Sequence, residues 1–209
     1  MSTDAITSSA PRVITLWELY GCGMEQVAAR VAEDLGLPVH GQAFSSEQIE
    51  ESAARREKQG LLSRFLDSLP PVATLTTGAG DAAITKAQAV EETARQVTAE
   101  VSGFAEEGGV ILGRNGAFLL HDRPNSLHVK LVGRLEDRVA NAARLSGITA
   151  ERAARRQPIE DAYRRELSRE VFHVDPAGDD YYDLVIDATR FTPDQVAAII
   201  VAAARSRAV

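Results

Sequence analysis

Short apolar runs alternate along this chain with longer stretches whose apolar residues recur every three or four positions. The first run, residues 13 to 17 (VITLW), predicts a buried strand, and Val27, Val31 and Leu35 behind it predict an amphipathic helix. Short apolar strands separated by helices predict a parallel sheet covered by helices on both faces. Further strands are expected in residues 110 to 116 (VILGRNG, which ends in a turn), 126 to 133 (SLHVKLVG) and 183 to 187.

The remaining helices are predicted from polar helical patterns and from residues that begin or end helices. Three of them, between residues 134 and 171, are rich in arginine, and Pro158 separates the second from the third. The expected helices lie within residues 39 to 70, behind a cap at Ser45 or Ser46; over residues 81 to 106; over residues 117 to 121; over residues 134 to 146, 149 to 157 and 159 to 171; and from Pro193 to about Arg207.

Composition indicates a single globular domain. The chain has 209 residues, of which 44% are hydrophobic and 25% charged, so a domain over residues 12 to 209 can bury a substantial core. Residues 1 to 11 are small and polar and predict a disordered tail that is not a signal peptide. No apolar run approaches the roughly 20 residues that span a bilayer. We therefore expect a cytoplasmic protein that does not contact a membrane.

Candidate metal and thiol chemistry is sparse in this sequence. A single cysteine, Cys22, excludes an internal disulfide and a multi-cysteine metal site. The four histidines show no ligand spacing, so no transition-metal site is predicted, and His128 in the middle of a strand reads as a core residue. Cys22 stands between two glycines, which favours a small residue tolerated in a tight turn over a reactive thiol, because no basic neighbour lowers its pKa.

The charge of the chain argues against nucleic acid as a partner but is compatible with a small ligand that carries phosphate. The formal net charge of −7 argues against binding to bulk nucleic acid. Residues 134 to 169 nevertheless contain nine arginines and no lysine. Biased codon usage and solvated salt bridges account for such a cluster as well as phosphate binding does. Arginine suits phosphate because its planar guanidinium can hold two oxygens at once.

A glycine loop, residues 19 to 23 (LYGCG), connects the first strand to the first helix. Strand, glycine loop and helix together form the layout of a phosphate-binding loop, in which backbone N–H groups and a helix N-terminus favour an anion. In this chain Met24 stands at the usual lysine position and Glu25 at the usual serine or threonine position. The loop therefore has the shape of a phosphate site without its usual charge.

With these features the chain resembles the cytidylate kinase-like members of the P-loop nucleoside monophosphate kinases, from about Val13 to Ile200. The resemblance is carried by ITLWELYGCG with its helix, by VILGRNGAFLL, and by an arginine-rich segment followed by YYDLVIDATRF and a final helix. It implies an α/β fold with a parallel five-stranded sheet flanked by helices. It also implies a helical acceptor arm over residues 41 to 80 and an arginine-rich helical lid over residues 134 to 172.

The resemblance further implies nucleotide ligands, ATP with Mg²⁺ as the donor, and a set of site residues. Arg114 is expected to hold the acceptor's phosphate, and Arg164, with Arg155 or Arg156 nearby, is expected to act from the lid. Arg165 is the alternative to Arg164, because an arginine-rich helix can be aligned with the family pattern in two positions that differ by one residue. The residues expected to be catalytic are Arg114, Arg164 and Arg156, and those expected to bind the donor are Gly21, Cys22, Gly23, Met24, Glu25, Thr189 and Arg190.

Two hypotheses follow from these residues. The first is a phosphotransferase that moves a phosphoryl group from ATP to a nucleoside monophosphate, most simply CMP, with Glu18 or Glu25 recruited to Mg²⁺. The second is a catalytically degenerate pseudokinase that acts as a nucleotide-binding or partner-binding module. The overall layout, Arg114 and the lid favour the first. Glu18, Met24 and Glu25 favour the second, since a carboxylate close to a triphosphate disfavours its binding.

Overall fold

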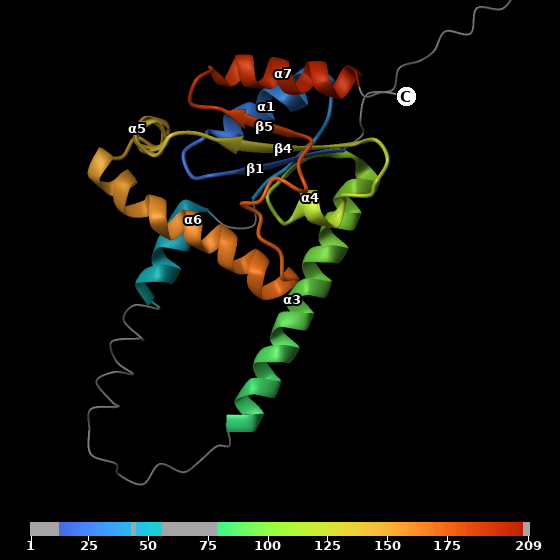
Figure 1. Ribbon diagram of the computed structural model, residues 1–209, viewed down its shortest axis with the longest axis vertical. Helices are drawn as coiled ribbons and strands as arrows, with labels where there is room; N and C mark the ends of the chain where they lie inside the picture. Colours follow the sequence, from blue (N-terminus) through green and yellow to red (C-terminus); the bar gives the residue numbers. More distant parts are fainter. Residues whose placement is uncertain (1–12, 43–44, 56–78, 207–209) are drawn as a thin grey trace, which may run out of the picture.

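The computed structural model of the protein describes residues 13 to 42, 45 to 55 and 79 to 206 (Figure 1). The expected tail, residues 1 to 11, lies outside the described residues, and so do residues 43, 44 and 56 to 78 of the expected acceptor arm. Within the described ranges, no helix combines the length and the apolar character needed to cross a bilayer.

A five-stranded sheet forms the centre of the molecule, with strand order β2-β3-β1-β4-β5. Every pair of neighbouring strands is parallel, and β1 lies in the middle, where it pairs with both β3 and β4. The predicted parallel five-stranded sheet flanked by helices is thus confirmed. The strands are β1 (Val13–Glu18), β2 (Val39–His40), β3 (Gly109–Leu112), β4 (Ser126–Val132) and β5 (Leu184–Asp187).

Helices cover both faces of the sheet, as the apolar runs in the strands require (Figure 1). On one face, α1 (Met24–Leu35) and α7 (Pro193–Ser206) form one apolar core with the sheet, in which Ile14 of β1 is fully buried. On the other face, α3 (Ala79–Glu107) and the short α4 (Gly116–Leu119) pack against the neighbouring residue, Val13. The period-two alternation of strand residues thus divides β1 between two cores.

Parallel pairing brings the carboxyl ends of the strands to one edge of the sheet. In register, Leu16 of β1 pairs with Leu112 of β3, and Glu18 pairs with Leu131 of β4. The segments that follow the strands therefore gather at this edge, which is where ligands of open parallel sheets bind. These segments are the glycine loop after β1, residues 113 to 115 after β3, residues 133 and 134 after β4, and residues 188 to 190 after β5.

The arginine-rich region forms two helices, α5 (Leu135–Ser146) and α6 (Ala150–Phe172). The predicted break at Pro158 is wrong, because α6 continues through this residue. An interior proline removes one backbone hydrogen bond and costs about 3 kcal/mol. Tertiary contacts on both sides hold the helix together: Arg156 pairs with Glu50 at 2.7 Å, and Asp161 accepts a hydrogen bond from a loop amide.

Candidate functional site

A cavity of about 540 Å³ opens at the carboxyl edge of the sheet, between the start of α1, α3 and α6. We call it the edge cavity. Its described wall combines apolar surface with a few polar side chains, a combination typical of ligand sites. The residues that line it are Trp17, Glu18, Met24, Gln42, Ile49, Thr93, Gln96, Val97, Glu100, Leu112, Gly113, Arg114, Asn115, Tyr163, Arg164, Ser168, Val171 and Phe172.

Arg114 lies in the wall of the edge cavity, directly after β3. Its backbone takes the left-handed conformation, with φ +54°, in the turn that follows Gly113. The guanidinium donates to the carbonyl of Gly41 at 3.0 Å, forms an ion pair with Glu100 and lies 5.3 Å from the centre of the Phe104 ring. Arg114 thus forms a structural ion pair and also lines the cavity. Its expected role in binding the acceptor's phosphate stays a prediction.

Arg164 reaches the edge cavity from α6. Its guanidinium pairs with Glu160 at 2.5 Å, lies 3.8 Å from a carboxylate oxygen of Glu18 and contacts the side-chain oxygen of Gln42 at 3.5 Å. Its neighbour Arg165 instead lies 3.9 Å from Asp175 and is not among the described residues that line the cavity. Of the two arginines left open by the sequence, the structure brings Arg164 to the cavity.

Arg156 lies away from the edge cavity and is only 1% exposed. It pairs with Glu50 at 2.7 Å and with Glu47 at 3.1 Å, both in the helical segment of residues 46 to 55. Hydrogen bonds from Arg152 and Arg156 lower the pKa of Glu50. The buried guanidinium therefore joins α6 to the described part of the expected arm.

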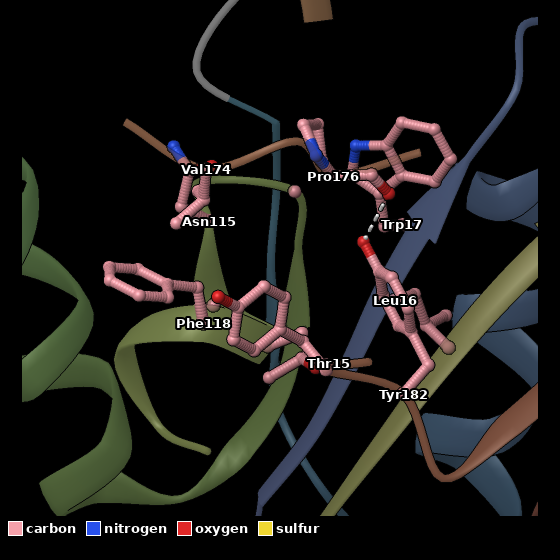
Figure 2. A pocket seen from close by; sticks show the side chains of 12 residues that line it. Thr15, Leu16, Trp17, Asn115, Phe118, Val174, Pro176 and Tyr182 are labelled. Carbon is pink, nitrogen blue, oxygen red and sulfur yellow. Dashed lines mark hydrogen bonds between the residues drawn. The ribbon is translucent and has the colours of Figure 1, made fainter. Parts of the chain in front are cut away.

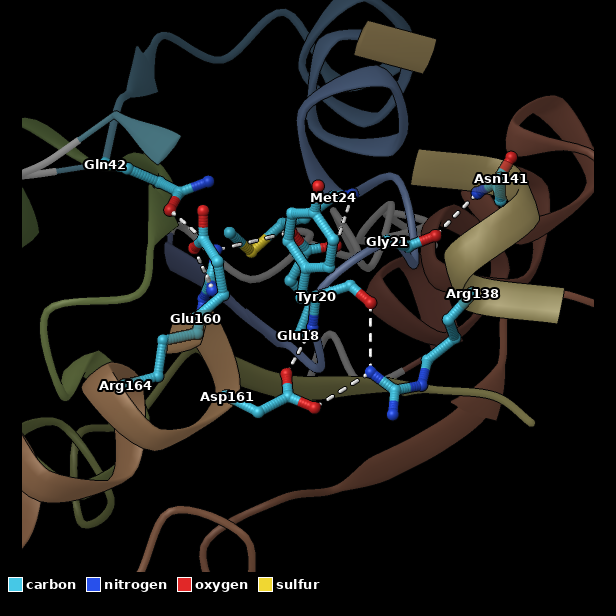
Figure 3. A network of polar contacts seen from close by, with 10 residues as sticks. All are labelled: Glu18, Tyr20, Gly21, Met24, Gln42, Arg138, Asn141, Glu160, Asp161 and Arg164. Atoms are coloured by element: carbon cyan, nitrogen blue, oxygen red, sulfur yellow. Dashed lines mark hydrogen bonds and ion pairs between the residues drawn. The ribbon is translucent and has the colours of Figure 1, made fainter. Parts of the chain in front are cut away.

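Residues 20 to 23 of the glycine loop are buried, and so is Met24, the first residue of α1. Two of its backbone N–H groups meet carboxylates of the chain itself: that of Tyr20 donates to Asp161 at 2.7 Å, and that of Met24 donates to Glu18 at 3.0 Å. Figure 3 shows both carboxylates turned toward the loop. The anion that such a loop favours is here supplied from within the protein.

Helix α5 lies directly against the glycine loop. Arg138 donates to the carbonyl of Tyr20 at 2.9 Å and to Asp161 at 3.0 Å, and Asn141 donates to the carbonyl of Gly21 at 2.7 Å. A Cβ atom at Gly21 would lie 2.2 Å from the carbonyl oxygen of Arg138. The approach of α5 therefore requires glycine at this position, independently of any phosphate.

Burial raises the pKa of two groups beside the loop. It raises the pKa of the Glu18 carboxyl, against the opposing effects of Arg164 and the Met24 amide. Burial also raises the pKa of the Cys22 thiol well above its usual range, and Glu18 adds to this shift. A thiol held protonated is a poor nucleophile. The structure thus supports the interpretation of Cys22 as a small loop residue.

The other residues expected to bind the donor lie outside the edge cavity. Glu25 is exposed on the first turn of α1. The hydroxyl of Thr189 donates to Asp187 at 2.6 Å, and its methyl group packs so close to Gly133 that a Cβ there would lie 2.3 Å away. Thr189 and Arg190 therefore follow β5 at the same sheet edge as the loop and are not among the described residues that line the cavity.

These side chains do not fit a bound Mg²⁺–triphosphate as they stand. Met24 offers no ammonium group and Glu25 no hydroxyl, while the Glu18 carboxylate already accepts from the Met24 amide beside Arg164. Among the described residues, no group of three histidine, cysteine or acidic side chains is placed to hold a metal ion. Metal and triphosphate would need a different arrangement of the loop.

A second, much smaller cavity lies behind Trp17 (Figure 2), with a volume of about 10 Å³. That is room for about one water molecule, so it is no site for a base. Tyr182 packs 6.2 Å from the Trp17 ring and donates from its hydroxyl to the carbonyl of Pro176 at 3.1 Å. On this side Trp17 is a packing residue. His128 is buried as expected and hydrogen-bonds Thr15 at 2.8 Å.

Sequence reasoning missed the side of the cavity that α3 supplies. Thr93, Gln96 and Glu100, with Val97, recur at three- and four-residue spacing and face the cavity together. The spacing is visible in the sequence, but it predicts only that these residues share a helix face. The partners Arg138 and Asp161 of the glycine loop were also missed, because they are distant from it in sequence.

Comparisons with known proteins agree with this geometry. A sequence model described as "Cytidylate kinase-like family" matches residues 13 to 190. A protein of Methanopyrus kandleri named cytidylate kinase is 32% identical over 203 residues, which cover 91% of this chain and 92% of that protein. A crystal structure of an uncharacterized protein from Eubacterium ventriosum superposes with a TM-score of 0.63 at 18% identity, covering 93% of this chain and 98% of the other.

A third relative shares only a segment. A protein of Corynebacterium glutamicum named uronate isomerase is 33% identical over 126 residues, which are 60% of this chain and 24% of that protein. The chain thus spans about a quarter of the length of this relative.

Proposed function

Because the chain belongs to the cytidylate kinase-like family, we propose that it transfers a phosphoryl group from ATP to a nucleoside monophosphate, most simply CMP. The observation that carries this proposal is the edge cavity, in which Arg114 and Arg164 meet from different elements at the carboxyl edge of the sheet. Its volume of about 540 Å³ suits a mononucleotide. The name of the Methanopyrus kandleri relative supports CMP as the acceptor.

The two arginines have distinct tasks in this proposal. Arg114, fixed by Gly41 and Glu100, holds the acceptor's phosphate and orients its attacking oxygen. Arg164 approaches from α6 and neutralises charge that develops on the phosphoryl group during transfer. The attacking oxygen of the acceptor phosphate forms the new P–O bond as the bond to the donor's leaving diphosphate breaks. The apolar part of the wall takes the nucleoside and excludes water.

A coupled assay over a panel of nucleoside monophosphates, with ATP and Mg²⁺, tests this proposal. We expect turnover with at least one acceptor, and we expect Arg164→Ala to lower kcat/KM by about 100-fold or more, the usual effect of removing one charge-stabilising donor. Arg165→Ala is the matched control, since it removes the same charge one residue away from the cavity wall. Absence of turnover with every acceptor would exclude the phosphotransferase.

One observation favours a second candidate, a pseudokinase that binds nucleotides or a partner without turnover. The carboxylate of Glu18 accepts from the amide of Met24, which is expected to bind the donor, and Asp161 accepts from the amide of Tyr20 in the same loop. An increase in the melting temperature of the protein when CMP is added, without turnover in the coupled assay, would support this candidate.

A further inference from the structure

We propose that the protein closes its own donor site, with Glu18 as an internal anion in the place of a donor phosphate and with α5 and α6 fastened over the glycine loop. A triphosphate then binds only after Glu18 leaves the Met24 amide and these helices move off the loop. This inference rests on the proposed function, since it concerns the donor half of the same reaction.

The contacts of Glu18 are those expected of a bound phosphate. Its carboxylate accepts from the N–H of Met24, the first residue of α1, at 3.0 Å, and lies 3.8 Å from the guanidinium of Arg164. A helix N-terminus and an arginine are the two groups that bind a phosphate oxygen most commonly. Glu18 is only 7% exposed, so it shares these groups with little solvent.

A second contact fastens the other end of the loop. Asp161 of α6 accepts from the Tyr20 N–H at 2.7 Å, and Arg138 of α5 donates both to the Tyr20 carbonyl at 2.9 Å and to Asp161 at 3.0 Å. One peptide unit on each side of Tyr20 is thereby held by a buried ion pair. Both members of the pair are nearly buried, with 7% and 11% of their side chains exposed.

Packing leaves no room for phosphates above the loop in this arrangement. Gly21, Cys22 and Gly23 are all buried, and Gly21 approaches α5 so closely that one added carbon atom would overlap its backbone. The edge cavity, in contrast, is open and holds Glu18 and Arg164 in its wall. The acceptor can therefore enter first and place its phosphate on Arg114, while Glu18 still lies beside Arg164.

Isothermal titration with ATP and Mg²⁺ tests the closed loop on the full chain. We expect Glu18→Ala to bind ATP about tenfold more tightly or better than the parent, since the variant removes an anion from the position of the phosphate. Glu33→Ala is the matched control: it removes the same charge from an exposed position of α1 that has no part in the proposed site. We expect this control to change the affinity by less than about threefold, through screened long-range charge alone.

Asp161→Asn provides a second variant, because it weakens the other fastening without touching Glu18. A gain in ATP affinity with both Glu18→Ala and Asp161→Asn supports the proposal. Unchanged ATP affinity in Glu18→Ala, or an equal gain in Glu33→Ala, would overturn it.

Titration with CMP and the turnover assay separate this inference from the proposed function. Tighter ATP binding by Glu18→Ala without turnover in any variant would support the closed loop and exclude the phosphotransferase. Turnover by the parent chain, combined with no effect of Glu18→Ala on ATP affinity, would exclude the closed loop and leave the phosphotransferase standing.

Discussion

Glu18 is the last residue of β1, and its environment differs from that of an ordinary acidic residue. It faces Arg164 and Glu160 from α6 and Glu25 from α1, and burial outweighs the favourable partners, so its pKa is raised. In a solvent-exposed turn the same carboxylate would simply be ionised. The sequence shows a negative charge beside a glycine loop, but only its burial gives that charge an energetic cost.

The raised pKa of Glu18 predicts how stability depends on pH. The protonated carboxyl stabilises the folded state. This contribution to the free energy of unfolding is fully present below the ordinary pKa of 4.5, and it is lost as the pH rises through the raised pKa of the folded state. Glu18→Gln removes the charge, so we expect the variant to unfold at a higher urea concentration than the parent near neutral pH. That advantage should shrink as the pH falls toward 4.5.

Urea unfolding at several pH values measures this effect, with Glu25→Gln as the control on the exposed first turn of α1. A gain for Glu18→Gln that stays constant from neutral pH to 4.5 would contradict the assignment of a raised pKa.

Among the elements, α5 determines what the glycine loop can do. Gly21 has φ +90°, and a Cβ there would lie 2.2 Å from the backbone of Arg138. Gly36, after α1, also has a positive φ of +65° but has nothing within 4 Å of the added carbon. The two glycines therefore share a backbone conformation and differ in whether another element packs against them.

This difference predicts the stabilities of two alanine variants. Gly36→Ala should lower the free energy of unfolding by about 1 kcal/mol, the cost of a positive φ in a residue other than glycine. Gly21→Ala should lower it by about 3 kcal/mol or more, because α5 must also be displaced. Thermal or urea unfolding of both variants measures the two costs, and equal losses would mean that α5 does not pack on the loop in solution.

Helix α6 shows where reasoning from local signals is insufficient. Pro158 predicts a break, and the side chains of Gln157 and Asp161 instead meet across it at 2.6 Å. The contacts that keep the helix continuous, from Arg156 to Glu50 and from Asp161 to Tyr20, join residues more than 100 positions apart. Helix propensity depends only on residues that are close in sequence, so it cannot account for contacts between residues this far apart.

In the molecule as a whole, α6 connects the glycine loop, the edge cavity and the helical segment of residues 46 to 55. Asp161 contacts the loop, Arg164 lines the cavity, and Arg156 pairs with Glu50. Arg156 is almost fully buried, so its charge depends on Glu50 and Glu47 for compensation. The described part of the arm and α6 are expected to move as one unit when the site opens.

Removing one carboxylate of this connection should destabilise the folded chain. We expect Glu50→Gln to lower the free energy of unfolding by about 1 to 3 kcal/mol, the range for a hydrogen bond to a charged group that is lost inside a protein. Glu51→Gln, next in sequence but exposed and 3.9 Å from Arg55, should cost less than about 0.5 kcal/mol. Urea unfolding compares them, and a loss of similar size in both variants would show that the Arg156 contact contributes nothing.

The sequence by itself determined four of the five strands, their parallel arrangement and the edge of the sheet at which the candidate site lies, but neither β2 nor the continuity of α6 through Pro158. These predicted features follow from apolar periodicity and from the positions of glycine. Both are local patterns of a few residues, so they can be recognised in the sequence. The same signals placed Arg114 after β3 and marked the glycine loop as an anion site. They also identified the family resemblance, which the match over residues 13 to 190 confirms.

Only the tertiary structure decided which anion meets the loop and which arginine meets the cavity. Asp161 reaches Tyr20 across 141 positions, and Arg164 rather than Arg165 lines the cavity because of the face that α6 turns toward α3. Such pairings depend on the packing of helices with one another, to which a local pattern contributes only the choice of buried face. The shape of the loop therefore follows from its glycines, which are visible in the sequence, whereas the packing of α5 and α6 decides that carboxylates of the protein itself accept from the Tyr20 and Met24 amides.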